Sequence, residues 1–305
     1  MSESGSAKVY TPKIGVAAKP PPVVLPYPAS LFLNRSKRFL ALASGHQLEG
    51  YLRFLATVTR AQHDTQATLA EVVPPPAEVV TKAVTHGMPP LSRTSFKPDE
   101  LAETTLDRFL ETLAKAELPA EAAAAVKTLQ SMTSEQRHTV VKNVLNETIE
   151  QDRIAQHVLV LAGLQVHFTR LAAKLDQSAL KSVADGICPT CGSRPLASSV
   201  VNWPGATNTR FCTCSLCATM WYVVRVKCLL CGSNESINFR LIEGQPDTIK
   251  AETCDKCHGY VKIFYQIKDP TLEPLADDVA SLGLDILLSE DGWSRGGYNP
   301  FLLGY

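Results

Sequence analysis

The chain before residue 184 is dominated by apolar residues at helical spacing. In segment 46–72, Leu48, Leu52 and Leu55 fall on one stripe, the pattern of a helix that packs one face against a core. The same periodicity predicts helices over 29–45, 46–72, 99–117, 120–132, 133–149 and 150–180. Thr133 and Gln136 add a capping box at the start of one of them. These segments together predict an α-helical domain over residues 29–184.

Prolines interrupt and flank this helical pattern. Residues 1–28 end in KPPPVVLPYP, which is incompatible with a helix and predicts an extended arm whose apolar part, Val23–Leu25, is a candidate to dock on the body. Several prolines in 74–98 predict an irregular connection that contains at most a short helix. Helical periodicity returns after residue 270, so we expect residues 269–305 to form a C-terminal helix and an apolar tail that pack back on the helical domain.

Two groups of polar residues in the predicted helices admit ordinary interpretations. Arg35, Lys37 and Arg38 are clustered, and such a cluster is either a solvated face or a docking patch for an acidic partner. We interpret His157 and His167 as polar neighbours within the bundle and not as metal ligands.

The composition changes abruptly after residue 184, because all nine cysteines lie between residues 188 and 257. Eight of them form four Cys-x-x-Cys pairs, namely Cys188/Cys191, Cys214/Cys217, Cys228/Cys231 and Cys254/Cys257. The segments 221–226 and 260–268 are rich in aromatic and β-branched residues and predict strands of short hairpins. This region therefore predicts small β modules organised by cysteine.

The four pairs form a tandem repeat. Each cysteine of the first two pairs has a counterpart 40 residues later, and CPTCGS at 188–193 matches CLLCGS at 228–233. A repeat unit normally folds as one structural unit. We therefore predict a first rubredoxin-like or zinc-ribbon module over residues 185–226 and a second over residues 227–268.

Each module supplies four thiolates to one ion under this interpretation. Two thiolates separated by two residues face one tetrahedral ion, and a second pair completes the shell. Gly192 and Gly232 follow the first pair of each copy, where a tight turn needs a positive φ. The predicted ligands are Cys188, Cys191, Cys214 and Cys217 in the first site, and Cys228, Cys231, Cys254 and Cys257 in the second.

Two other arrangements of eight cysteines remain open from the sequence. A disulfide framework is one, although a chain of this length has a sufficient core without such crosslinks. An interleaved pairing, in which the first pair shares an ion with the third, is the other, and the repeat argues against it. Four thiolates do not select the metal, because an all-sulfur tetrahedral shell suits both zinc and iron.

Two further residues near the pairs have less definite roles. Cys212 has Glu252 as its counterpart in the second copy, so it is either a reserve or redox-responsive thiol or an ordinary packed cysteine. His258 follows Cys257 directly, and we interpret it as a residue beside the site or on the surface, since four cysteines already complete the shell.

Charge and motifs exclude several classes of function. Lys and Arg together number 30 and Asp and Glu together number 30, so no global charge favours nucleic acid or acidic lipid. The beginning of the chain lacks the apolar stretch of a secretory signal, and no apolar run is long enough to cross a membrane, so we expect a cytoplasmic protein. The chain has no P-loop, GxSxG, GxGxxG or HExxH motif, and saturated four-cysteine sites leave no position for substrate. We therefore expect no enzymatic activity.

Several longer segments resemble the formate dehydrogenase accessory protein family of the FdhE type. The resemblance rests on these segments: RSKRFLALASGHQLEGYLRFL, CPTCGSRP, CSLCATMWYVVRVKCLLCGS, AETCDKCHGYVKIFYQ, KDPTLEPLADDVASLGLDILL and the C-terminal NPFL. It covers nearly the whole chain and is weakest before residue 29 and through 74–98. The Cys-x-x-Cys pairs are common to many ribbons, whereas their combination with ETCDKC and NPFL is much more specific.

This resemblance implies a helical N-terminal domain followed by two rubredoxin-like modules, each binding one iron, with zinc as a possible substitute. It also implies a cytoplasmic maturation or proofreading protein, without enzymatic activity, that engages the catalytic subunit of molybdenum-containing formate dehydrogenase before export by the twin-arginine route. The alternative is a rubredoxin-like protein that transfers electrons to that partner. A zinc-ribbon nucleic-acid binder would need a strongly basic face, and the slight excess of Lys and Arg in 188–268 is poor support for one.

Overall fold

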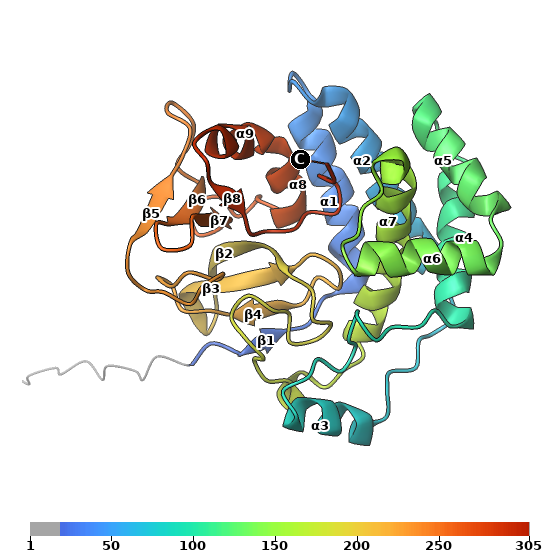
Figure 1. Ribbon diagram of the computed structural model, residues 1–305, viewed down its shortest axis with the longest axis horizontal. Helices are drawn as coiled ribbons and strands as arrows, with labels where there is room; N and C mark the ends of the chain where they lie inside the picture. Colours follow the sequence, from blue (N-terminus) through green and yellow to red (C-terminus); the bar gives the residue numbers. More distant parts are fainter. Residues whose placement is uncertain (1–18, 305) are drawn as a thin grey trace, which may run out of the picture.

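The computed structural model describes residues 19–304 and places a helical bundle beside a β-sheet that carries the cysteines (Figure 1). The helices are α1 (Pro28–Ala43), α2 (Glu49–Gln66), α3 (Ala77–Thr85), α4 (Glu100–Leu113), α5 (Ala120–Ser131), α6 (Ser134–Leu145), α7 (Ile154–Ala172), α8 (Pro274–Ala280) and α9 (Leu282–Glu290), with 3-10 turns η1 (Gln151–Arg153) and η2 (Gln177–Ala179). The predicted helices are confirmed, and α3 is the short helix allowed in the proline-rich connection. Of the predicted arm, residues 1–18 lie outside the described residues.

Local signals in the sequence explain where several helices begin. Asp99 accepts a hydrogen bond from the backbone N–H of Ala102 over 2.8 Å and caps α4. The predicted capping box of α6 is confirmed, because Thr133 and Gln136 each accept a hydrogen bond from the backbone N–H of the other. A cap satisfies backbone donors that have no partner in the first turn of a helix.

Helix α7 is the centre of the bundle, and nearly all of its side chains are buried. At Gly163 a side chain would lie 2.8 Å from Leu106, so the glycine allows α4 to approach closely. The same hydrophobic core extends from α7 into the cysteine region, where it includes Leu216 and Trp221. None of the described helices combines the length and apolar composition needed to span a membrane.

The strands form one continuous sheet in the order β1-β4-β3-β2-β7-β6-β5, with β8 paired to β7. The strands are β1 (Val23–Val24), β2 (Pro195–Trp203), β3 (Ala206–Cys214), β4 (Met220–Tyr222), β5 (Ile237–Arg240), β6 (Ile249–Cys254), β7 (Gly259–Phe264) and β8 (Ser294–Arg295). Strands β2 to β4 belong to the first cysteine repeat and β5 to β7 to the second. The two groups meet where β2 pairs with β7 in parallel, with Ser198 opposite Ile263.

The predicted strand segments are present but shorter than expected. The segment 221–226 contributes only the end of β4, because the chain leaves the sheet after Val223 to reach the second repeat. The segment 260–268 contributes β7 and then turns, with the Lys268 N–H donating to the Tyr265 carbonyl. The docking candidate in the arm is confirmed as β1, where Val23 pairs with Trp221 and is buried.

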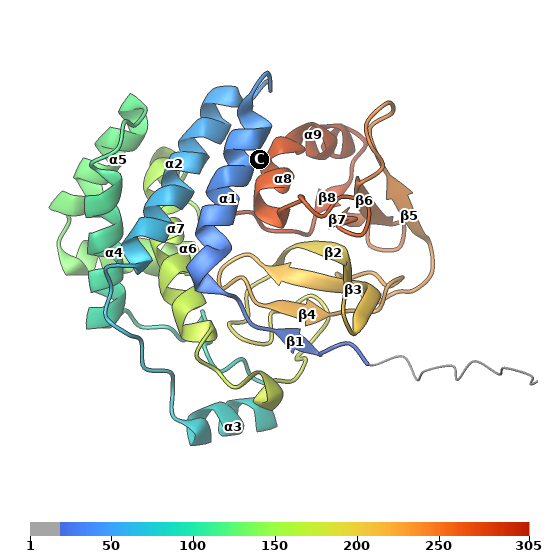
Figure 2. The same ribbon diagram turned by 180° about the vertical axis from the view of Figure 1, so that it is seen from behind.

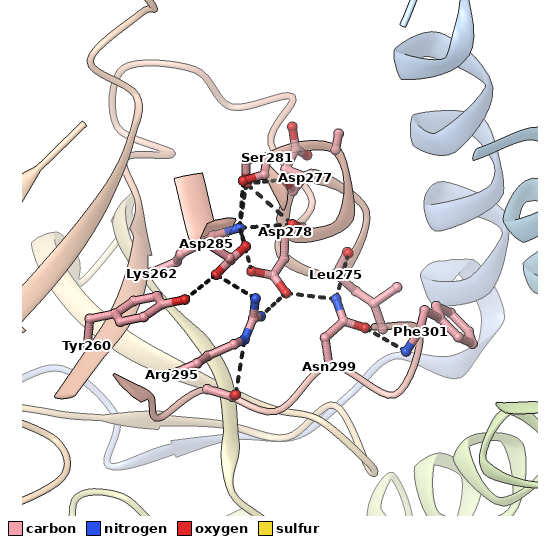
Figure 3. Close-up of polar contacts among 12 residues, drawn as sticks. Tyr260, Lys262, Leu275, Asp277, Asp278, Ser281, Asp285, Arg295, Asn299 and Phe301 are labelled. Atoms are coloured by element: carbon pink, nitrogen blue, oxygen red, sulfur yellow. Dashed lines mark hydrogen bonds and ion pairs between the residues drawn. The ribbon is translucent and has the colours of Figure 1, made fainter. Parts of the chain in front are cut away.

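The C-terminal helices are fixed to the sheet by a buried charged network (Figure 3). The Lys262 ammonium on β7 lies 2.5 Å from Asp285 of α9 and 3.2 Å from Asp278 of α8. Arg295 also pairs with both carboxylates, and Asn299 donates to Asp278 over 2.8 Å. Burial alone would raise the pKa of Asp278, but Arg295 and Lys262 outweigh it and lower this pKa.

The apolar tail packs back on the helical bundle, as expected, and ends beside α1 and α2 (Figures 1 and 2). Phe301 is buried, its ring lies 6.4 Å from that of Phe39, and its carbonyl accepts a hydrogen bond from the Tyr51 hydroxyl over 2.6 Å. The C-terminal elements therefore connect the sheet to the bundle.

Both interpretations of the basic cluster on α1 are wrong for its two arginines. Arg35 is buried and pairs with Glu273 over 2.8 Å, whereas Arg38 makes a two-point ion pair with Asp277. Both acidic residues belong to α8 or its N-terminal cap. The acidic partner of these arginines is thus a distant part of the same chain, which the local sequence pattern does not reveal.

Candidate metal centres

The cysteines gather into two groups that follow the sequence repeat. Site 1 comprises Cys188, Cys191, Cys214 and Cys217, and site 2 comprises Cys228, Cys231, Cys254 and Cys257. Within each site the four sulfur atoms lie within 4.8 Å of one another. This grouping excludes the interleaved arrangement, in which the first and third pairs would meet.

The spacing of the sulfur atoms fits a tetrahedral ion. In site 1, Cys188 Sγ lies 3.6 Å from Cys217 Sγ, and in site 2, Cys228 Sγ lies 3.7 Å from Cys257 Sγ. A metal–sulfur bond of about 2.3 Å places the sulfurs of a regular tetrahedron about 3.8 Å apart. All nine cysteines are free, so the structure does not contain the disulfide framework. The donor set is soft and tetrahedral, which suits zinc and iron alike.

The first Cys-x-x-Cys turn has the same backbone geometry in both sites. In site 1 the Gly192 N–H donates to the Cys188 carbonyl over 2.9 Å, and in site 2 the Gly232 N–H donates to the Cys228 carbonyl over 3.0 Å. Both glycines have positive φ, 77° and 74° respectively, as the sequence predicts. This turn folds the chain back so that both thiols of a pair face the same point.

The second Cys-x-x-Cys turn ends in a left-handed residue that is not glycine. Ala218 has φ 57° in site 1, and its repeat counterpart His258 has φ 51° in site 2. The His258 N–H donates to the Cys254 carbonyl over 2.9 Å, and its exposed side chain lies against the Trp293 ring. His258 therefore shapes the turn beside site 2, in agreement with the expectation that it lies next to the site or on the surface.

Site 1 is enclosed on all sides by the fold. Each of its cysteines is at most 1% exposed. The Ser193 hydroxyl lies 3.3 Å from Cys191 Sγ and the Thr219 hydroxyl lies 3.2 Å from Cys217 Sγ. Hydroxyl and backbone N–H groups that donate to thiolate sulfur stabilise its negative charge. The sequence did not predict these two hydroxyl contacts. Its only signal for them is the repeated CGS, of which Ser193 is part.

Site 2 lies at the surface. Cys228 and Cys254 are buried, whereas Cys231 and Cys257 are exposed. The Leu230 N–H donates to Cys228 Sγ over 3.4 Å, and the Leu230 side chain itself is 41% exposed. The two sites therefore share ligands and spacing but differ in their access to solvent.

Cys212 lies outside both sulfur groups. It is on β3, pairs with Trp221 of β4 and Ser198 of β2, and is fully buried. Burial raises the pKa of its thiol to about 12, which keeps the thiol protonated at neutral pH. A protonated, enclosed thiol is a poor nucleophile, so the structure favours the packed cysteine over the redox-responsive one.

A buried ion pair joins the two cysteine modules. Arg210 of β3 and Glu252 of β6 pair over 2.7 Å, with side chains that are 0% and 3% exposed. Burial raises the pKa of Glu252, although Arg210 opposes this shift. Glu252 is the counterpart of Cys212 in the repeat. The first copy therefore has a packed thiol at this repeat position, and the second copy has the carboxylate that pairs with Arg210. The sequence offered no signal for this pairing.

Comparisons with known proteins agree with this architecture. Family models described as "FdhE, N-terminal", "FdhE, central domain" and "FdhE, C-terminal domain" match residues 20–185, 187–225 and 226–302. A protein called "Protein FdhE homolog" from Rhizobium meliloti (strain 1021) is 42% identical over 96% of both chains. A homolog of the same name from Haemophilus ducreyi is 34% identical over 92% of both chains.

A solved structure shows the same fold. The crystal structure of the FdhE protein from Pseudomonas aeruginosa matches with a TM-score of 0.85 and 33% identity, over 93% of this chain and 99% of that one. The fold class expected from the sequence, a helical N-terminal domain with two β modules and a C-terminal helix that packs back, is thus confirmed, except that two helices, α8 and α9, stand in place of the one expected at the C-terminus. On the evidence of its sequence over nearly its full length and of its fold, the chain belongs to the FdhE family.

Proposed function

We propose that this protein is a cytoplasmic maturation factor for respiratory, molybdenum-containing formate dehydrogenase, and that it binds the catalytic subunit before twin-arginine export. Membership of the FdhE family supports this proposal, because the resemblance described in the sequence analysis implies an accessory role toward formate dehydrogenase. The protein has no enzymatic activity of its own under this proposal. Two four-sulfur sites without an open position support a role in binding rather than in hydrolysis.

We further propose that all eight cysteines of sites 1 and 2 are metal ligands and that each site holds one iron, for which zinc can substitute. The ion crosslinks the two Cys-x-x-Cys turns of a module, and it thereby makes each module rigid. Binding of a metal to such a site supplies on the order of 10 kcal/mol of folding free energy. The surface that the modules form beside the helical bundle then serves as a preformed platform for the immature subunit.

Loss of one Cys-x-x-Cys pair tests this proposal. A Cys228→Ser/Cys231→Ser variant removes half of the ligands of site 2, so we expect the second module to become disordered and capture of the catalytic subunit to fail. Tagged variant and wild-type proteins are compared by co-purification of that subunit from cells that express it. Metal analysis of the same samples, purified without oxygen, reports the number and kind of ions per chain.

A Cys212→Ala variant is the matched control, because it also removes a cysteine from residues 185–268 but leaves both sites intact. It should capture the subunit as the wild type does. Undiminished capture by the Cys228→Ser/Cys231→Ser variant would contradict the proposed role of the metal-bound modules.

Exposure of site 2 favours a second candidate, a rubredoxin-like electron-transfer protein. An iron held by four thiolates changes between the ferrous and ferric states by one electron, and Cys231 and Cys257 bring the edge of site 2 to the surface. This candidate predicts a red protein with a reversible couple. If a colourless, zinc-loaded protein supports assembly of active formate dehydrogenase, electron transfer is not required.

A further inference from the structure

The tandem repeat provides an internal comparison between the two sites. Thr190, Cys191 and Gly192 of site 1 correspond to Leu230, Cys231 and Gly232 of site 2, 40 residues later. Both turns have the same backbone hydrogen bonds and the same positive φ at the glycine. The two sites therefore differ in solvent exposure because of the segments that pack against them and not because of their ligands.

The connection between α3 and α4 covers the turn of site 1. The Leu91 N–H donates to the Thr190 carbonyl and the Arg93 N–H donates to the Cys191 carbonyl, each over 2.9 Å. A Cβ placed on Gly192 would lie 3.1 Å from Pro89, so this connection lies directly on the turn. The second turn of site 1 is also held by the bundle, since Gln165 of α7 donates to the Ser215 carbonyl over 2.8 Å.

The corresponding turn of site 2 is covered less. Gly186 lies against the Leu229 carbonyl and Gly296 against the Leu230 side chain, but among the described residues no backbone N–H of another segment donates to the carbonyl of Leu230 or Cys231. Leu230 is 41% exposed and Cys231 is exposed, whereas their counterparts Thr190 and Cys191 are both 0% exposed. The nearest atom to a Cβ placed on Gly232 is the flexible end of Lys227 at 3.9 Å. Two of the four ligand residues of site 2, Cys231 and Cys257, are therefore open to solvent in the folded protein.

We propose that the two sites have different tasks: site 1 retains its ion as long as the protein is folded, and site 2 exchanges its ion with solution while the helical bundle and the first module stay folded. This proposal rests on the proposed metal binding. Release from site 1 requires opening of the core that it shares with the bundle, which is a rare event in a folded protein. At site 2 an incoming thiolate or chelator displaces the exposed ligands one at a time.

The experiment measures release of zinc from the full-length protein. The protein is loaded with two zinc ions without oxygen, mixed with an excess of a chromogenic chelator, and followed by absorbance. We expect two phases of one ion per chain each, with rates that differ on the order of 100-fold, because only the slow one requires opening of the core. Far-ultraviolet circular dichroism should keep the helical signal through the fast phase.

Thiol labelling assigns the phases without any substitution. Iodoacetamide added with the chelator, followed by peptide mass spectrometry, should modify Cys231 and Cys257 during the fast phase. Cys188 and Cys217 should react only during the slow phase. Release in a single phase, or labelling of site 1 before site 2, would overturn the proposal.

A variant in the covering connection provides the matched test. Leu91→Asp places a charge at a buried position beside the Thr190 carbonyl, so it should accelerate the slow phase and leave the fast phase unchanged. Equal acceleration of both phases would contradict the assignment. A protein that cannot be loaded with two zinc ions would instead contradict the proposed metal binding, so the two failures are distinguishable.

Discussion

His167 is a buried ionisable side chain whose ring nitrogens have no hydrogen-bond partner among the described residues. It is 1% exposed, and its ring centre lies 5.5 Å from that of Phe96 and 5.7 Å from that of Phe168. This apolar environment lowers its pKa to about 4, because burial disfavours the charged imidazolium. The prediction that this histidine is an ordinary residue of the bundle is consistent with its aromatic neighbours.

The lowered pKa of His167 makes stability depend on pH. Between about pH 6.5 and pH 4 the unfolded chain binds a proton at this residue that the folded chain does not bind, so stability falls as the pH falls. Between pH 7.5 and pH 5 we expect His167 to lower the free energy of unfolding of the wild type by about 2 kcal/mol. The His167→Phe variant should lack this part of the decrease. Guanidinium unfolding of both proteins at the two pH values measures this difference. An identical loss in both proteins would show that His167 does not contribute.

The second prediction at the residue scale concerns Cys212. Because its thiol is buried and its pKa is raised, we expect it to stay unmodified by iodoacetamide in the native protein and to react only after denaturation. Cys212→Ala should keep the full metal content, as the sulfur lies outside both sites. Peptide mass spectrometry and metal analysis give the two readouts. Loss of one ion in the variant would identify Cys212 as a ligand.

At the scale of the elements, buried ion pairs attach α8 and α9 to β7. Lys262 is 1% exposed and faces Asp278 and Asp285, while its ammonium also donates to the carbonyls of Asp278 and Ser281. A buried ion pair is not by itself strong evidence for stability, but removal of one partner leaves uncompensated charge in the interior.

We therefore predict that Lys262→Met lowers the free energy of unfolding by about 3–5 kcal/mol, since Arg295 alone then faces both carboxylates. Urea unfolding followed by circular dichroism measures the effect. Lys268→Met is the control, because Lys268 pairs with Asp247 at the surface and its loss should change stability little. A similar effect of both substitutions would argue against the structural importance of the buried network.

At the scale of the whole molecule, the helical bundle and the cysteine modules share a core. The cluster that contains Phe109 and Leu161 of the bundle also contains Cys217 and Trp221 of the first module. The arginines of α1 add ion pairs to α8 and its cap. The division into domains at residues 29–184, 185–226, 227–268 and 269–305 stays a prediction from the sequence. Because the bundle shares its core with the first module, we expect that it does not fold independently.

A fragment of residues 19–184 tests this expectation. Without the first module the apolar face of α7 is exposed, so we expect the fragment to bind a hydrophobic dye, to aggregate and to unfold without a cooperative transition. Co-expression with residues 185–305 should restore a soluble complex. A sharp thermal transition of the isolated fragment, close to that of the full chain, would show instead that the bundle is an autonomous domain.

The sequence alone determined the features that depend on neighbouring residues. Helix positions follow from the spacing of apolar residues and from caps such as Asp99 and Thr133, because helical hydrogen bonds are local. The composition of sites 1 and 2 also follows from the sequence, since a two-residue spacer directs both thiols of a pair to one point and the 40-residue repeat assigns the pairs.

Only the tertiary structure decided features that depend on distant segments. Strand β2 is buried along most of its length, so its sequence PLASSVVNW lacks the alternation that identifies a half-exposed strand, and its parallel pairing with β7 joins residues more than 60 positions apart. The unequal burial of the two sites has the same origin. Their ligands repeat faithfully, but Pro89 and Leu91 cover only the first, and burial is set by segments that the local pattern does not include.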